Sequence, residues 1–574
     1  MVLISNSLLI LNPLLFRQAV MAVDPYLPGC DGFLGEVTCS LFGARSTSVW
    51  PWVLSLLLIA ITSATFKYWM RMTFITVSRD AEMEIRSTIF DRLQRQSRGF
   101  FDRHGIGELL SRLTNDISAY RDVLGPGVMY PLFFLTLMIP GLIALFSISV
   151  PLTSISLVPL LVIPLVNFTL RGYIFRISLS VQKALGEMSS MVQEHFSAIR
   201  IIKSYVIEKI VGERFRKLCQ KLLSMNIRLS FLQGSLFPFF TFLTKMITVI
   251  LVMFSGIIIF RGWSDLNAAD FVSFMWIQSY IFFPVLMLGW LIPVYGRGRA
   301  AYERILEIYE EPIEVQDVSK SGLKIPQRAN IVFRDLSFSY PRAESPALSH
   351  IDLEIQGGSF VGITGPIGAG KTTLFHLLTR EYEIPTGMIA IDGHDIHDYP
   401  LSAFHSEMVT VEQVPFLFSR SIAENVRFGR REASMEEVKV VTRYADFHDT
   451  VLEFPEKYET IIGERGVTLS GGQKQRLAMA RAFLVNRSIL LLDDIFSAVD
   501  VATEKRIFDG MKKNFRGKTV LLVTHRVSIL EQMDRIIYLS GGAVLEDGTH
   551  KELCALKGHY AALTELQGMG IEGK

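Results

Sequence analysis

Six long apolar blocks in the first 300 residues constrain the fold of this chain more than any other feature. Crossing a bilayer as a helix takes roughly 20 apolar residues. Backbone polar groups find no water in lipid, so such blocks are expected to be helices, and these tolerate internal prolines such as Pro131, Pro140 and Pro159. The blocks are Met1–Phe16, Trp50–Trp69, Gly125–Phe146, Pro151–Leu170, Phe237–Phe260 and Phe271–Val294.

The distribution of lysine and arginine orients these spans. The connection Lys67–Asp122 holds ten of them and Arg171–Arg228 holds eleven, whereas Asp24–Val49 and Arg261–Asp270 hold one each. By the positive-inside rule, the two long connections and the C-terminal part are cytoplasmic. Buried helices of a large soluble protein are the alternative, but they would not produce this asymmetry.

The first block is shorter than a span and begins at Met1 without a charged flank. A signal peptide is a poor alternative because the positive n-region is missing. We therefore expect the given start to lie inside the first helix. Cys30 and Cys39 fall in the expected outer loop, where they either pair, if that side is oxidising, or stay free.

Both cytoplasmic connections alternate apolar and charged residues with helical spacing, as in "AEMEIRSTIFDRLQRQSRGFF" and "SSMVQEHFSAIRIIKSYVIEK". Spans two to five are therefore expected to continue beyond the bilayer as helical rods. Each connection should turn through a short transverse helix, around Gly107–Asn115 and around Ser204–Glu208.

The composition changes after residue 300. We expect a transmembrane domain over 1–300, a polar linker over 301–329 and a second domain over 330–574, where short apolar strands alternate with helical stretches. That order is typical of an α/β domain with a mostly parallel sheet. The net charge of +2 gives no case for nucleic acid, and the four cysteines show no metal-ligand spacing.

A phosphate-binding loop follows the apolar strand in "SFVGITGPIGAGKTTL". Backbone N–H groups of such a loop and of the following helix cradle phosphate oxygens. Lys371 would reach the β/γ-phosphates and Thr372 would ligate Mg²⁺. The expected ATP-binding residues of this loop are Gly365, Pro366, Ile367, Gly368, Ala369, Gly370, Lys371, Thr372 and Thr373.

The strand "ILLLDD" ends in two carboxylates, Asp493 and Asp494. Strand ends of α/β sheets bind ligands, so Asp493 is expected to hold Mg²⁺ and Asp494 to face the attacking water. Asp494 is one methylene shorter than the glutamate that such sites usually carry.

The segment "GERGVTLSGGQKQRLAMARAF" resembles the signature of ATP-binding cassette (ABC) proteins, through Leu469, Ser470, Gly471, Gly472 and Gln473. Positions before and after this segment also match family motifs, in the order in which the family carries them. The membrane half resembles ABC exporters of the type IV fold, since "FFDRHGIGELLSRLTNDI" and "VQEHFSAIRIIKSYVIEK" are similar to their intracellular loops. The further matching positions are Tyr340, Gln413, His525 and the loop Ser497, Ala498, Val499 and Asp500.

The resemblance implies a half-transporter that works as a dimer in a membrane, with the bacterial inner membrane as its location and the cassette in the cytoplasm. Two cassettes would close head to tail, with each ATP between one P-loop and the other chain's signature. Tyr340 would stack on adenine. Gln413 would contact Mg²⁺ and water, and His525 would bind the γ-phosphate.

The shorter Asp494 predicts that the two ATP sites of such a dimer hydrolyse ATP at different rates. A carboxylate misplaced by about 1 Å can cost roughly 10² in rate, so the chain's own site is expected to bind ATP but to hydrolyse it slowly. Its intact signature would complete the partner's site, as in heterodimeric exporters with one degenerate site. A homodimer with slow aspartate-based hydrolysis stays open because His525 is present.

The transported substrate is not encoded in any motif. Lipids, drugs or peptides are the expected class, with export favoured over siderophore-type import on the same fold and over a regulatory ATP-binding subunit. Lys245 lies within the fifth span, where ionisable residues are expensive. It either contacts an anionic substrate group in the cavity or extends toward cytoplasmic water.

Overall fold

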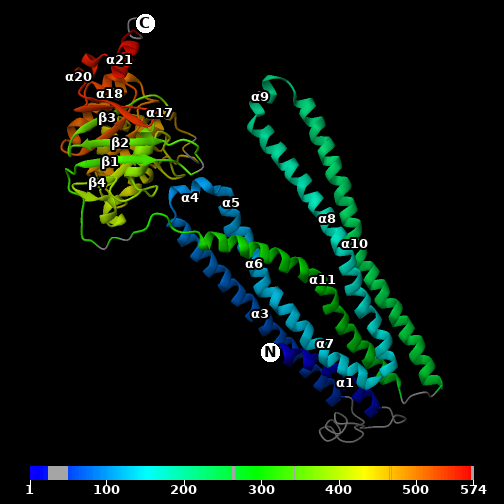
Figure 1. Cartoon of the computed structure of the whole chain (residues 1–574). Coiled ribbons are helices and arrows are strands. Elements are labelled where there is room, and N and C mark those ends of the chain that lie inside the picture. Colours follow the sequence, from blue (N-terminus) through cyan, green and yellow to red (C-terminus); the bar gives the residue numbers. More distant parts are fainter. Residues whose placement is uncertain are drawn as a thin grey trace. The chain divides into compact units, whose positions relative to one another are not determined.

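The computed structural model describes residues 1–23, 50–261, 266–317, 319, 321–341, 343–463, 466 and 468–569. Cys30 and Cys39 lie outside these residues. The chain divides into two compact units (Figure 1). We call Met1–Arg92 with Leu109–Glu310 the membrane unit, and Leu93–Glu108 with Glu311–Lys574 the cassette unit.

The membrane unit is built from long helices. Five stretches of the described helices are long and apolar enough to cross a membrane: Val2–Met21, Trp50–Gln94, Ile106–Ile148, Val150–Leu170 and Glu208–Arg261. The sixth expected span lies on α11. The helices are α1 Val2–Val23, α3 Trp50–Gln94, α5 Ile106–Ser111, α6 Ile117–Asp122, α7 Val128–Ile148, α8 Val150–Ser197, α9 Ile199–Ser204, α10 Glu208–Arg261 and α11 Ala268–Glu310, with π-helical stretches η1 Arg112–Asp116 and η2 Val123–Gly127.

The expected cytoplasmic rods are present. Helix α3 has 45 residues, which at 1.5 Å per residue is about 68 Å and more than twice the hydrocarbon thickness. Helices α8 and α10 run side by side and are joined by α9 at their tip (Figure 1). Helices α1, α7 and α11 pack together around a core that includes Ile10, Leu137 and Ile281. The expected prolines lie inside α7 and α8.

The first expected span was too short. Helix α1 continues past Phe16 to Val23, because Arg17 forms an ion pair with Asp270 and Gln18 is buried. An arginine that is paired in this way does not end a helix. Helix α11 likewise continues to Glu310, inside the expected 301–329 linker.

The transverse helices also lie earlier in the chain than expected. The first is α4, Arg98–Arg103, which ends because His104 adopts an extended backbone. Residues Gly107–Asn115 instead begin the returning helix. The second is α9, which ends at Ser204; the turn after it covers 205–207, where Val206 has a φ of 54°.

The cassette unit contains two sheets. The six-stranded sheet has the order β10-β9-β3-β8-β7-β6, in which only β10 is antiparallel to its neighbour. A four-stranded antiparallel sheet has the order β2-β1-β4-β5. The strands are β1 Ile331–Phe338, β2 Leu348–Ile355, β3 Phe360–Thr364, β4 Ile389–Ile391, β5 His394–Asp395, β6 Met408–Val411, β7 Ile489–Asp493, β8 Thr519–Val523, β9 Arg535–Ser540 and β10 Ala543–Gly548.

Helices follow the strands of the larger sheet, as the sequence predicted. All residues of β3, β7 and β8 are buried, which explains their uninterrupted apolar runs. The helices are α12 Lys371–Leu378, α13 Leu401–Ser406, α14 Ile422–Val426, α15 Met435–Tyr444, α16 His448–Glu453, α17 Gly471–Val485, α18 Val501–Asn514, α19 Val527–Leu530, α20 His550–Leu556 and α21 His559–Met569, with 3₁₀ turns η3 Ile396–Asp398, η4 Arg427–Gly429 and η5 Lys457–Glu459.

Candidate functional site

The phosphate-binding loop leaves the carboxyl end of β3 and enters α12. Gly365 has a φ of 141°, and a Cβ there would lie 1.9 Å from the carbonyl oxygen of Leu539. Only glycine fits this approach. Lys371 Nζ donates to the carbonyl oxygens of Gly365 and Pro366, both at 2.8 Å. Burial lowers the pKa of the Lys371 ammonium, although neighbouring carboxylates oppose that shift.

Two oxygen donors meet beside this loop. Thr372 Oγ1 donates to Asp493 Oδ2 at 2.7 Å, joining the start of α12 to the end of β7. Strands β3 and β7 flank β8, so their ends open on the same edge of the sheet. Hydroxyl and carboxylate oxygens are the ligands that Mg²⁺ prefers, and this pair fits such an ion.

The three catalytic candidates are linked. Gln413 Nε2 donates to Asp494 Oδ2 at 3.1 Å, and the Asp494 amide donates to Val523 O at 3.0 Å. Burial raises the pKa of the Asp494 carboxyl, while nearby His525 and the Gln413 hydrogen bond oppose the rise. Burial and the charge of Lys371 lower the pKa of His525. The Asp494 carboxyl and the His525 imidazole therefore share one partly buried environment at the edge of the sheet.

Tyr340 follows β1 and lies against α12. Its hydroxyl is 3.0 Å from Thr373 Oγ1 and 3.3 Å from His376 Nδ1. Its ring meets the Tyr382 ring edge-on, with 5.3 Å between the centroids. An aromatic ring thus stands next to the helix that follows the phosphate-binding loop.

The signature lies on a different part of the cassette. Ser470 caps α17 in a capping box with Gln473, and α17 packs against α14, α15 and β6. Leu469 is buried, whereas Ser470 and Gly471 are exposed. Within the described part of the chain, no hydrogen bond or ion pair joins residues 469–473 to residues 365–373. The exposed Ser470 and Gly471 are free to face another molecule.

The loop after Asp494 approaches the signature closely. A Cβ on Gly472 would lie 2.5 Å from Ala498 O. Ser497 Oγ donates to Asp494 O at 3.0 Å, and Asp500 caps α18 by accepting from the Thr503 amide. The signature helix and the end of β7 are therefore connected through this loop.

Sequence reasoning missed the side chain that makes this connection. The buried Gln475 donates to Ser497 Oγ at 2.9 Å and to Gln413 O at 3.3 Å, and its Oε1 accepts from the Ala498 amide at 3.2 Å. A second missed residue is Arg526, which pairs with the buried Glu504 and donates to Val499 O at 2.7 Å. Their polarity on otherwise apolar helix and loop faces was the available signal.

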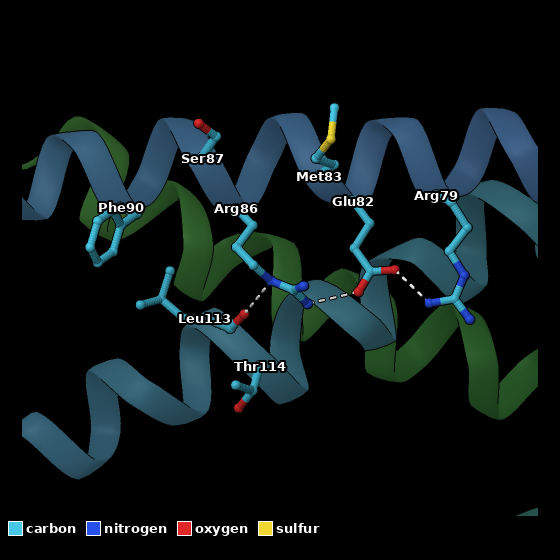
Figure 2. A pocket seen from close by; sticks show the side chains of 8 residues that line it. All are labelled: Arg79, Glu82, Met83, Arg86, Ser87, Phe90, Leu113 and Thr114. Carbon is cyan, nitrogen blue, oxygen red and sulfur yellow. Dashed lines mark hydrogen bonds and ion pairs between the residues drawn. The ribbon is translucent and has the colours of Figure 1, made fainter.

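The membrane unit contains a separate polar feature. Figure 2 shows a cavity lined by α3 residues, among them Arg79, Glu82 and Arg86, and by Leu113 and Thr114 of η1. Its volume is about 750 Å³. Glu82 accepts from Arg79 at 2.9 Å and Arg86 at 2.7 Å on its own helix, and from Arg121 of α6 at 3.3 Å. Lys245, the candidate substrate contact, is exposed on α10.

The chain is similar to ABC transporters over most of its length. The ABC transporter transmembrane region family matches residues 1–285, and the ABC transporter family matches residues 348–497. The ABC transporter ATP-binding protein YknU of Bacillus subtilis is 34% identical over 84% of this chain and 82% of its own length. The multidrug resistance-like ATP-binding protein MdlA of Escherichia coli is 31% identical over 90% of this chain and 87% of its own.

Two further similarities extend this result. The ATP-dependent lipid A-core flippase of Syntrophus aciditrophicus is 28% identical over 96% of this chain and 94% of its own length. The fold matches that of a bacterial Atm1-family ABC exporter with ATP bound, with a TM-score of 0.76 at 24% identity over 99% of this chain and 96% of the other.

The apolar helices, the P-loop domain and the relatives all indicate a membrane-bound ABC transporter. The expected multi-pass location in a bacterial inner membrane is confirmed. The chain belongs to the ABC transporter family, as a half-transporter whose membrane domain is fused to an ATPase that drives transport.

Proposed function

We propose that this half-transporter exports lipids, drugs or peptides as one half of a heterodimer, and that its own ATP site binds nucleotide but hydrolyses it slowly. The observation that carries the proposal is Asp494, directly after β7, in a chain whose signature is intact. Its carboxylate is held by Gln413 at 3.1 Å, one methylene closer to the backbone than a glutamate would reach. The relatives named for multidrug resistance and for lipid A-core flipping support this substrate class.

ATP and Mg²⁺ fit the residues present. The loop 365–373 would hold the phosphates, with Lys371 on the β/γ-phosphates, and Tyr340 would stack on adenine. Thr372, Asp493 and Gln413 would hold Mg²⁺, which when bound neutralises phosphate charge. His525, kept neutral by its lowered pKa, would donate a hydrogen bond to the γ-phosphate.

The exposed signature residues would act on a different ATP. Ser470 offers a hydroxyl, and Gly471 and Gly472 offer backbone donors, to the γ-phosphate bound by a partner's P-loop. Gln475 would hold that signature in register with Gln413 and the loop after Asp494. One chain would therefore contribute to two sites and complete neither alone.

ATP turnover in Asp494 variants tests this division. We would measure the chain alone and co-expressed with a candidate partner, a half-transporter whose corresponding strand ends in Asp-Glu, both in lipid. In the pair, Asp494→Asn should leave turnover within about 2-fold, whereas Asp494→Glu should raise turnover at the chain's own site by up to about 10². Asp509→Asn, which removes an exposed carboxylate on α18, is the matched control.

Two results would reject the degenerate-site assignment. The first is loss of ATP turnover by the co-expressed pair when this chain carries Asp494→Asn. The second is brisk, substrate-stimulated hydrolysis by the chain alone, which would instead establish a homodimer in which Asp494 works. Neither result would affect the assignment to ATP-driven transport.

A further inference from the structure

Helix α4 docks on the cassette through tightly packed residues of the same unit. Phe100 is fully buried, and a Cβ on Gly99 would lie 3.5 Å from the Tyr382 ring. The Arg98 amide donates to the Glu381 carbonyl oxygen at 3.1 Å. Because α4 directly follows α3 in the chain, the backbone links this docked helix to a membrane-spanning helix.

One side chain of the cassette unit contacts both α4 and Tyr340. Tyr382 is 4% exposed, and its hydroxyl donates to the carboxylate of Asp102 on α4. Burial and this hydrogen bond raise the pKa of Tyr382, so it stays a protonated donor. The same ring meets the ring of Tyr340 edge-on, at 5.3 Å and 84°.

A second connection runs in parallel. Arg98 donates to Glu381 Oε2 at 2.7 Å, and Glu381 lies 3.9 Å from His376 Nε2. The other nitrogen of His376 is 3.3 Å from the Tyr340 hydroxyl. Two sets of contacts thus start on α4 and both end on Tyr340.

We propose that Tyr382 is a positioning residue that couples adenine bound on Tyr340 to the docking of α4, so that each strengthens the other. This inference rests on the proposed adenine position. Adenine on one face of Tyr340 would restrict that ring, the restricted ring would hold the Tyr382 edge, and the Tyr382 hydroxyl would hold Asp102. Linkage makes the effect reciprocal: docked α4 raises nucleotide affinity by the factor by which nucleotide favours docking.

A purely structural role for Tyr382 makes a different prediction. A group that only anchors α4 should change the hydrogen-exchange rate of α4 equally with and without nucleotide. A coupling group should change the ratio of the exchange rate without nucleotide to the rate with nucleotide. We call this the protection ratio, and it distinguishes the two roles.

Hydrogen exchange of α4 in the full-length chain in lipid nanodiscs tests the proposal. The Arg98 amide reports docking directly. In the wild type, a non-hydrolysable ATP analogue should slow its exchange by about 5-fold or more, the usual lower range of a coupling. In Tyr382→Phe the exchange rates of α4 without and with the analogue should become about equal. The affinity for the analogue should fall by the same factor as the protection that is lost.

Two further variants complete the test. Asp102→Ala removes the same hydrogen bond from the α4 side and should also bring the exchange rates with and without the analogue together. If one of the two variants fails to fold, the other still tests the proposal. Tyr399→Phe removes another buried hydroxyl, bonded to Ile391 O at 2.8 Å, and should keep the wild-type ratio. An unchanged ratio in Tyr382→Phe and Asp102→Ala, or no protection in the wild type, would overturn the proposal.

The adenine position is tested separately. Tyr340→Ala should weaken binding of the analogue by about 10-fold, since base–aromatic stacking contributes roughly 1–3 kcal/mol. Unchanged binding in Tyr340→Ala would reject the adenine position. Weakened binding there together with an unchanged ratio in Tyr382→Phe would reject the coupling alone.

Discussion

Thr372 Oγ1 donates a 2.7 Å hydrogen bond to Asp493 Oδ2, so the helix after the P-loop and the strand that ends in two aspartates meet in one contact. The two residues are far apart in the chain but present oxygen atoms to one small volume. Such a pair is arranged to hold a small divalent cation that prefers oxygen ligands.

Thr372→Ala should therefore reduce the Mg²⁺-dependent part of ATP affinity by about 10-fold or more, the scale on which ligand and supporting groups affect metal sites. Affinity measured in the presence of a chelator should change little. Thr372→Ser keeps the hydroxyl and is the matched control. Equal losses with and without Mg²⁺ would show that Thr372 acts on the fold of the loop instead.

Two glycines of the P-loop should respond differently to alanine. A Cβ at Gly365 would lie 1.9 Å from Leu539 O, whereas a Cβ at Gly368 meets nothing within 4 Å. Gly365→Ala should abolish ATP binding because the loop must move. Gly368→Ala, at a φ of 80°, should cost only about 1–2 kcal/mol of backbone strain, measurable as a modest loss of thermal stability and affinity. Comparable losses in both variants would contradict this geometry.

The His525 imidazole makes the cassette sensitive to acid. Its pKa in the folded protein lies below the ordinary 6.5, so between that lowered value and pH 6.5 the unfolded chain binds more protons. The contribution of His525 to stability is therefore fully present above pH 6.5 and is lost as the pH falls through this window. His525→Gln should reduce the decrease in the cassette's melting temperature between pH 7.5 and pH 6.0.

The exposed His394 provides the control for that experiment. His394→Gln should leave the acid dependence as in the wild type. An identical decrease in wild type and His525→Gln would show that His525 is not the group whose protonation matters.

The sequence was informative where chemistry fixes both residue type and spacing. The P-loop between an apolar strand and a helix, and the strand ending in Asp493, were placed on the correct elements because phosphate and metal binding leave few alternatives. The long rods were predicted because periodicity continued beyond the apolar blocks. The mostly parallel sheet followed from the alternation of buried strands and helices.

The sequence failed where tertiary contacts decide the outcome. The transverse helix was expected at Gly107–Asn115, since helical periodicity exists on both sides of His104. Its actual position depends on contacts with residues much later in the chain, since the Arg98 amide donates to the Glu381 carbonyl oxygen and the Tyr382 hydroxyl donates to Asp102. The role of Gln475 was also hidden, because its partners Gln413 and Ser497 come from two separate loops. The membrane-domain substrate contact, for which Lys245 was suggested, stays a prediction.

Ser470→Ala should separate a transporter from a regulatory subunit that only binds ATP. Ser470 caps α17 in the same way that Ser434 caps α15, each through a capping box. Removing such a cap costs about 1 kcal/mol, so neither variant should unfold the cassette. If the signature completes a partner's site, Ser470→Ala should lower turnover of the assembled dimer by about 10², as does the loss of a donor to developing charge. Ser434→Ala should leave turnover within about 2-fold. Equal turnover in the two variants would mean that this signature does not act on ATP, and the regulatory function would then be the better explanation.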